Sequence, residues 1–358
     1  MKTFTCQCGN VLHFVNSQCI ACGLTIGFIA EDMRLSAFSI NQFGNLQASS
    51  NGKLYRKCKN YADYDVCNWM LPFEDKHEYC ESCRLSETIP KLDDPTNLTL
   101  WFRAEQSKRR LLYTLLKLNL PVTDRKTDPD TGLGFDFLQD ETEDQFGNEL
   151  TVKNFVTTGH AAGLITINLN EADHSSRIEM REKMRERYRT LLGHFRHESG
   201  HYYWDRLIAK SDKLAEFRQL FGDERLDYMQ SMQTYYKNGP SKDWQNVWIS
   251  AYASMHPWED WAETWAHYLH MVDTLETASD FDFSVSGNKI ANPTTDNNPH
   301  DQVYTASSFT HMFNDWCQLT KVLNALNRSM GLDDAYPFVI SMTALDKLRF
   351  VHEVVLDN

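Results

Sequence analysis

The segment HFRHESGHYYWDRL (194–207) contains the pattern His197-Glu198-x-x-His201. Residues i and i+4 of a helix lie one above the other on one face, so both imidazoles can place a nitrogen ~2.0 Å from one zinc ion. Glu198 points to the side, where it can accept a proton from water instead of binding metal. His194 lies on the same face, but it is roughly 10 Å along the helix axis from His201, too far to share a tetrahedral centre. The pattern predicts two ligands of a catalytic zinc and one general base.

A third ligand has to come from elsewhere in the chain. Zinc peptidases that continue as HExxHxxGxxH carry it on the same segment, but here Trp204 and Leu207 occupy those two positions. The segment YASMHPWEDWAETWAHYLH (252–270) offers ionisable side chains at helical spacing, and Pro257 suits its first helical turn. The candidates are His256, Glu259, Asp260, Glu263, His267 and His270. The alternative is that this is only a solvated helix face.

Eight of the nine cysteines lie before residue 84, in two groups. Clustered thiols in a reducing compartment bind metal more often than they form disulfides, and Gly9 and Gly23 suit the tight turns of zinc knuckles. The predicted structural zinc sites are Cys6, Cys8, Cys19 and Cys22 for the first ion, and Cys58, Cys67, Cys80 and Cys83 for the second. His77 could replace one cysteine of the second site. The alternatives are a redox Cys-x-x-Cys site and a disulfide framework. The two Cys-x-x-Cys stretches, CIAC and CESC, lack the βαβ context of a thioredoxin-like site.

The sequence predicts an α+β protein of two domains, whose helices and strands must position these groups. A chain of 358 residues with 42% hydrophobic residues exceeds what one core usually holds. Residues 1–90 are predicted to form a small cysteine-rich zinc-ribbon domain with both four-cysteine sites, followed by a proline-containing linker. Residues 97–358 are predicted to form a mainly helical, zincin-like metallopeptidase domain with a small sheet.

Within the second domain, Asn97 or Thr99 is expected to cap a helix that Pro121 ends. GLITINLN (163–170) predicts a strand, whose edge could pair with an extended substrate or be an ordinary sheet position. One long helix is expected from about Ser175 through the HExxH motif. The charged Arg196 directly precedes the motif, a departure from peptidases generally that is tolerable if the side chain points outward. A long loop is expected over 280–305 and further helices from residue 306.

The net charge of −13 is uneven along the chain. Residues 1–90 carry 8 basic and 9 acidic residues, and the remainder carries 28 and 40. This acidic remainder would repel phosphate backbones, so nucleic acid is not an expected partner. No apolar run approaches the roughly 20 residues that span a bilayer, and the N-terminal segment lacks the apolar stretch of a signal peptide. We therefore expect a cytoplasmic protein without membrane contact.

Two resemblances follow from these motifs. HESGH followed by Tyr-x6-Glu-x-x-Ala-Glu resembles the gluzincin peptidases, including the anthrax lethal factor-like enzymes. That resemblance implies Glu259 as the third zinc ligand, Tyr252 as a donor to the oxyanion, and Glu263 as a carboxylate that orients a ligand histidine. The stretches CQCGNVLHFVNSQCIACG, CESCRLSETIP, GHFRHESGHYYWDRLI and HPWEDWAETWAHYLHM resemble a bacterial family of zinc-binding metallopeptidases with an N-terminal zinc ribbon.

The expected function is hydrolysis of a peptide bond by a zinc-activated water, with one catalytic and two structural Zn²⁺. Glu198 would move the proton, and Tyr252, or failing that His256, would stabilise the oxyanion. The expected partners are a peptide or protein substrate and a protein that binds the ribbon. The alternatives are a zinc-stabilised binding or adaptor protein with a vestigial site, and a zinc hydrolase that cleaves a non-peptide amide.

Overall fold

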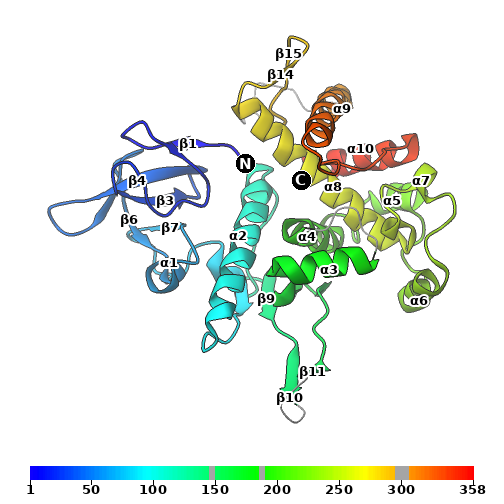
Figure 1. Ribbon diagram of the computed structural model, residues 1–358, viewed down its shortest axis with the longest axis horizontal. Coiled ribbons are helices and arrows are strands. Elements are labelled where there is room, and N and C mark those ends of the chain that lie inside the picture. The colour runs from blue at the N-terminus through cyan, green and yellow to red at the C-terminus, as the bar shows by residue number, and fades with distance from the viewer. Residues whose placement is uncertain (145–149, 185–189, 295–305) are drawn as a thin grey trace. The chain divides into compact units, whose positions relative to one another are not determined.

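The computed structural model describes residues 1–144, 150–184, 190–294 and 306–358, which form two units (Figure 1). The first unit comprises Met1–Lys117 and Pro121–Glu182, and the second comprises Leu118–Leu120 and Lys183–Asn358. The structure is mixed α and β, with a cysteine-rich N-terminal region followed by a helical region, as the sequence predicts.

The N-terminal region is built on a five-stranded antiparallel sheet in the order β3-β4-β5-β6-β7, coloured blue in Figure 1. A short hairpin precedes it, and short helices follow its last two strands. The bounds are β1 Phe4–Thr5, β2 Val11–Leu12, β3 Thr25–Ile29, β4 Arg34–Ile40, β5 Leu46–Ala48, β6 Leu54–Lys57, α1 Lys59–Tyr64, β7 Met70–Pro72 and η1 Cys83–Leu85. The strands are short and the turns between them are irregular, so little hydrophobic periodicity was available to predict this sheet.

Helix α2 (Pro95–Lys117) belongs to the same unit as the ribbon. The ring of Tyr113 lies 5.5 Å from Phe14 and 6.0 Å from Phe28, and it helps to form the core behind the sheet. The helix begins earlier than the expected cap at Asn97 or Thr99, because Pro95 fits its first turn and the Asp94 carboxylate accepts the Thr96 N–H at 2.8 Å.

A four-stranded sheet in the order β12-β13-β9-β8 completes the first unit. Its strands are β8 Ser86–Thr88, β9 Gly134–Leu138, β12 Gly159–Ala161 and β13 Leu164–Asn168, and a separate hairpin is formed by β10 Glu141–Asp144 and β11 Leu150–Asn154. The predicted strand at 163–170 is confirmed as β13. It lies between β12 and β9, so it offers no free edge to an extended substrate, and that expectation is wrong.

The prediction of one long helix from about Ser175 through the HExxH motif is also wrong. The structure has α3 (His174–Met184) and a separate α4 (Leu191–Leu207). Thr190 has an extended backbone with φ −128° and ψ 150°, and its hydroxyl accepts the Gly193 N–H at 3.0 Å. A threonine that satisfies a free N–H in this way starts a new helix, so the metal-binding motif has its own helix and its own cap.

The second unit is built from α4 and a series of further helices. Their bounds are α5 Leu214–Phe221, α6 Tyr228–Asn238, α7 Trp244–Val247, η3 Tyr252–Ser254, α8 Pro257–Asp280, α9 Ala306–Ser329 and α10 Met342–Leu356; the short 3-10 helix η2, Leu169–Ala172, precedes α3. The helices expected from residue 306 are confirmed. The expected loop at 280–305 contains the hairpin of β14 (Ser284–Val285) and β15 (Asn288–Lys289), and residues 295–305 lie outside the described residues. None of the helices in the described ranges is long and apolar enough to cross a membrane.

A buried histidine of α10 makes the stability of this helical unit depend on pH. The Nδ1 of His352 lies 3.0 Å from the Tyr268 hydroxyl, and burial lowers the pKa of His352 to about 4 from 6.5. Between these two pH values the unfolded chain binds more protons than the folded chain, so stability falls as the pH falls through this window. The effect corresponds to about 3 kcal/mol for this residue.

We therefore expect His352→Asn to reduce the slope of the unfolding free energy against pH between about pH 6.5 and pH 4. Denaturant unfolding at a series of pH values measures it, with the wild-type protein as reference. An identical slope in both proteins would contradict the assignment.

Candidate metal centres

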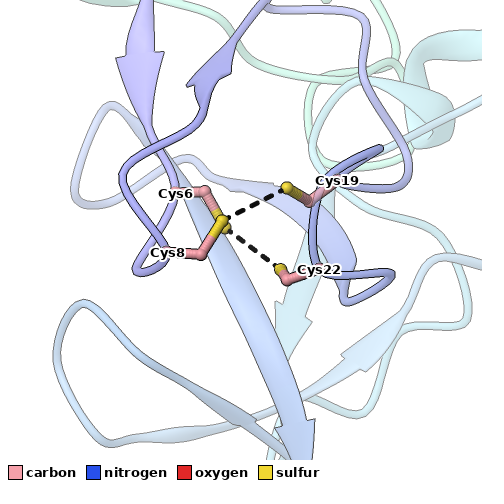
Figure 2. A group of neighbouring side chains, drawn as sticks. All are labelled: Cys6, Cys8, Cys19 and Cys22. Carbon is pink, nitrogen blue, oxygen red and sulfur yellow. Dashed lines mark hydrogen bonds between the residues drawn. The ribbon is translucent and has the colours of Figure 1, made fainter.

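The first cysteine cluster joins two turns of the ribbon, as Figure 2 shows. The Sγ atoms of Cys6 and Cys22 lie 3.7 Å apart, and so do those of Cys8 and Cys19. A tetrahedral zinc with Zn–S bonds of about 2.3 Å places its sulfurs about 3.8 Å apart, so the four side chains are spaced as such an ion requires. Gly9 and Gly23 have φ values of +87° and +72°, which confirms the predicted knuckle turns.

The second cluster brings together all four of the predicted cysteines, and all are buried. The Sγ atoms of Cys67 and Cys80 lie 3.7 Å apart. Burial raises the pKa of the Cys80 thiol well above its usual range, so its thiolate needs a cation nearby to form. His77 does not join the group, because it is exposed and its Nδ1 lies 2.8 Å from Asp75.

The third cluster consists of His197 and His201 from α4 and Glu259 from the first turn of α8. One ligand atom from each lies within 4.8 Å of the others. The Nε2 of His197 is 3.0 Å from Oε2 of Glu259, and the Nε2 of His201 is 3.3 Å from Oε1. Ligand atoms around a tetrahedral zinc are about 3.3 Å apart, so these three residues fit the ion that the motif predicts.

The hydrogen bonds around His197 show why a cation suits this position. Its Nδ1 lies 2.6 Å from Oε1 of Glu263, whose Oε2 accepts the Ser250 hydroxyl at 2.6 Å. A neutral His197 that donates to Glu263 directs the lone pair of Nε2 at the Glu259 carboxylate, which is also an acceptor. The buried Oε2 of Glu259 has no hydrogen-bond partner. Burial opposes a charge on His197, but the hydrogen bonds of Glu259 and Glu263 raise its pKa well above the usual range, so a proton on Nε2 resolves this contact without metal. A zinc ion would take the place of that proton.

Helices α4 and α8 approach each other closely at Gly200. A β-carbon at this position would lie 2.9 Å from the Cα of Ala262, which is backbone and cannot rotate away. The Trp261 indole donates to the Gly200 carbonyl at 2.8 Å, and the Trp265 indole donates to the Ser199 hydroxyl at 3.1 Å. These contacts bring the two ligand-bearing helix faces to the separation that the metal group needs.

The charged Arg196 before the HExxH motif does not point outward. The residue is 5% exposed and forms an ion pair with Asp273 of α8, so its charge is tolerated by pairing and not by exposure to solvent. The α4 segment around the HExxH motif is covered by α8, so residues before and after the histidines are buried as well. A buried guanidinium needs such a partner, and Asp273 supplies it.

The other ionisable residues of α8 do not form one functional face, nor a solvated one. Asp260 is fully buried and pairs with Lys347 of α10 at 2.6 Å. His267 lies 2.7 Å from the Tyr336 hydroxyl.

His256 caps α8: its Nδ1 accepts the Trp258 N–H at 3.1 Å and its Nε2 donates to the Leu226 carbonyl at 3.0 Å. Both ring nitrogens of His256 are engaged, so the alternative role as an oxyanion donor does not fit.

Two tyrosines and Glu198 complete the surroundings. Glu198 is buried at 8% exposure, and burial raises the pKa of its carboxyl. The Tyr252 ring lies 6.0 Å from the His197 ring, and burial together with the nearby Glu259 carboxylate raises the pKa of its phenol. Tyr228 was not predicted, although it donates a hydrogen bond of 2.9 Å to Oε1 of Glu259. It lies 31 residues before Glu259 in no recognisable motif, so the sequence offered no signal for it.

The helical site and the cysteine clusters together define a zinc-binding protein with a metallopeptidase-type centre. Residues 97–354 match the family described as "Putative zinc-binding metallo-peptidase", and residues 3–94 match one described as "zinc-ribbon domain". The chain therefore belongs to this zinc-binding metallopeptidase family and carries its zinc ribbon at the N-terminus.

Two mycobacterial proteins are similar over almost the whole chain. They are "Uncharacterized protein Rv2568c" of Mycobacterium tuberculosis and "Uncharacterized protein Mb2598c" of Mycobacterium bovis. Each is 40% identical over 357 residues, which cover 99% of this chain and 95% of the relative. No solved structure matches the chain.

The three clusters predict the metal content of the protein. We expect three zinc ions per chain in the wild-type protein and two in Glu259→Ala, because two histidines alone bind the third ion weakly. Elemental mass spectrometry of the purified proteins measures this, with the exposed Glu216→Ala as control. Three ions in both proteins would show that Glu259 is not a required ligand.

The close approach at Gly200 predicts that Gly200→Ala weakens metal binding at the helical site and lowers the melting temperature. A methyl group would force α4 and α8 apart, at a cost of about 1–3 kcal/mol that the better helix propensity of alanine only partly offsets. Calorimetry and zinc titration measure both effects. Unchanged zinc affinity would mean that the helices tolerate the shift.

Proposed function

We propose that the chain is a zinc-dependent peptidase that hydrolyses peptide bonds with an activated water and Glu198 as general base. The observation that carries this proposal is the convergence of the half-buried His197 with the buried His201 and Glu259, with Glu198 between the two histidines in the sequence. Membership of the metallopeptidase family supports the reaction class.

Zinc held by these three residues would act as a Lewis acid and lower the pKa of water toward about 7. In the proposed mechanism the Glu198 carboxylate takes one proton from the attacking water and later passes it to the nitrogen of the leaving amine. The phenol of Tyr252 donates a hydrogen bond to the oxygen that becomes negative on the scissile carbonyl. Glu263, held by Ser250, fixes the orientation of the His197 ring.

The two cysteine clusters are proposed as structural zinc sites, because each offers four thiols and leaves no ligand position open. Four-cysteine zinc sites need reduced thiols, so the proposed compartment is a reducing one such as the cytoplasm. A substrate peptide or protein is the proposed partner of the helical site, and a protein is the proposed partner of the ribbon.

The proposed domains are residues 1–90 and 97–358. The family matches cover residues 3–94 and 97–354, whereas the compact units divide the chain differently and place α2 with the N-terminal region. Helix α2 contacts the ribbon through Tyr113, and Arg109 donates to the Val66 carbonyl between two cysteines of the second cluster. A fragment that begins at residue 97 would lose these contacts. Experiments on the site therefore use the full chain.

The general-base role predicts that Glu198→Gln keeps its metal and loses turnover by about 10²–10⁴-fold, because glutamine has the same shape but cannot accept the proton. A mixture of peptides from a digested proteome serves as substrate, with new cleavage products detected by mass spectrometry. The zinc content of the same samples is measured in parallel.

Glu216→Gln provides the matched control, since it makes the same change at an exposed position of α5. Equal turnover in the wild-type protein and Glu198→Gln would contradict the mechanism. Zinc loading of the wild-type protein without cleavage of any peptide would instead favour the adaptor protein or the hydrolase of a non-peptide amide.

A further inference from the structure

The Glu259 carboxylate has two oxygens with different surroundings. Its Oε1 accepts the Tyr228 hydroxyl at 2.9 Å, whereas the buried Oε2 has no hydrogen-bond partner and lies 3.0 Å from Nε2 of His197. A carboxylate whose one oxygen is held by a phenol cannot rotate without breaking that bond. Oε1 also lies 3.3 Å from Nε2 of His201, so each oxygen faces one ligand histidine. Only Oε2 does so without a hydrogen bond from Tyr228.

Tyr228 is itself held in place from α8. Its ring contacts the His256 ring with centroids 5.3 Å apart, and the Nε2 of His256 donates to the carbonyl of Leu226, two residues before Tyr228. His256 also caps the helix that carries Glu259. One imidazole thus connects the backbone before α6 to the start of α8, and this connection sets the distance across which Tyr228 reaches Glu259.

Helix α6 lies largely exposed beside the site. It buries none of its side chains completely, and Met229 and Tyr236 are 56% and 60% exposed. It is closed at its ends by Asp227, which accepts the Gln230 N–H, and by Gly239 with φ +79°. Two of its side chains contact residues at the site. Tyr228, at its first position, donates to Glu259, and the ring of Tyr235 contacts the ring of Tyr252.

We propose that Tyr228 is a positioning residue that holds Oε1 of Glu259, so that Oε2 is the single carboxylate oxygen presented to the metal. This role rests on the proposed function, because it assumes that the group of His197, His201 and Glu259 binds zinc. Holding one oxygen with a hydrogen bond favours monodentate binding and keeps a coordination position open for water. Tyr228 acts through Glu259 and has no direct part in moving protons.

The test is Tyr228→Phe in the full chain, with Tyr236→Phe as control. Both remove one phenol hydroxyl from α6, but the Tyr236 side chain is exposed. We expect zinc at the helical site to bind roughly tenfold more weakly in Tyr228→Phe, measured by competition with a chelator, and as in wild type in Tyr236→Phe. The four-cysteine sites serve as the internal standard for correct folding.

Cobalt gives a second readout that does not depend on hydrolysis. We expect the visible absorption of Co²⁺ at the helical site to change in Tyr228→Phe, because a freed carboxylate can bind through both oxygens and raise the coordination number. Where peptide turnover is measurable, saturating metal is expected to restore most of kcat. Wild-type affinity and an unchanged cobalt spectrum in Tyr228→Phe would overturn the proposal, as would a loss of kcat at saturating metal with unchanged affinity, which would make Tyr228 catalytic.

These outcomes separate the proposal from the proposed function. If the wild-type protein binds metal at the helical site but cleaves no peptide, affinity and cobalt absorption still decide the role of Tyr228. If the wild-type protein binds no metal there, the site assignment fails together with this inference, and Glu259→Ala then leaves the metal content unchanged.

Discussion

The close contact of α4 with α8 at Gly200 is the constraint on which the metal centre depends. His197 and His201 stand on one helix and Glu259 and Glu263 on the other, so the distance between the helix axes decides whether the ligands meet. The absence of a β-carbon at Gly200 allows the backbone of Ala262 to come near. The indoles of Trp261 and Trp265 then bond to the α4 residues beside it and fix the register of the two helices.

The contacts of α8 with α4 and with α10 bury several charged side chains, and most of them have a partner of opposite charge nearby. Arg196 pairs with Asp273, and Lys347 pairs with Asp260, each within an apolar environment where an unpaired ion would be costly. The carboxylate of Glu259 accepts a hydrogen bond from the Tyr228 hydroxyl on one oxygen only. The proposed metal ion would supply positive charge beside Oε2, which has no hydrogen-bond partner.

The N-terminal ribbon is limited by the size of its hydrophobic core, because a short five-stranded sheet buries too little apolar surface to be stable by hydrophobic burial alone. The two groups of four cysteines would supply cross-links through the proposed zinc ions, which would couple folding of this region to metal binding. Helix α2 adds the aromatic contacts of Tyr113 and the buried guanidinium of Arg109, although its sequence matches the peptidase family. The ribbon and the first helix of the peptidase match thus share one core.

The amino-acid sequence by itself determined the features that local geometry controls. The i, i+4 spacing of His197 and His201, the knuckle turns at Gly9 and Gly23, and strand β13 follow from periodicity and turn chemistry within a few residues. The meeting of Glu259 with the histidines was expected from a resemblance, and its position rests on contacts between segments far apart. Only the tertiary structure decided that Arg196 is buried, that Thr190 divides the long helix, that His256 is a cap and that Tyr228 reaches Glu259. The burial of Arg196 and the reach of Tyr228 depend on which helix covers which, and helix packing is set by shapes and partners that no single segment encodes. The caps at Thr190 and His256 are local hydrogen bonds, but a helical pattern alone does not show which polar residue forms one.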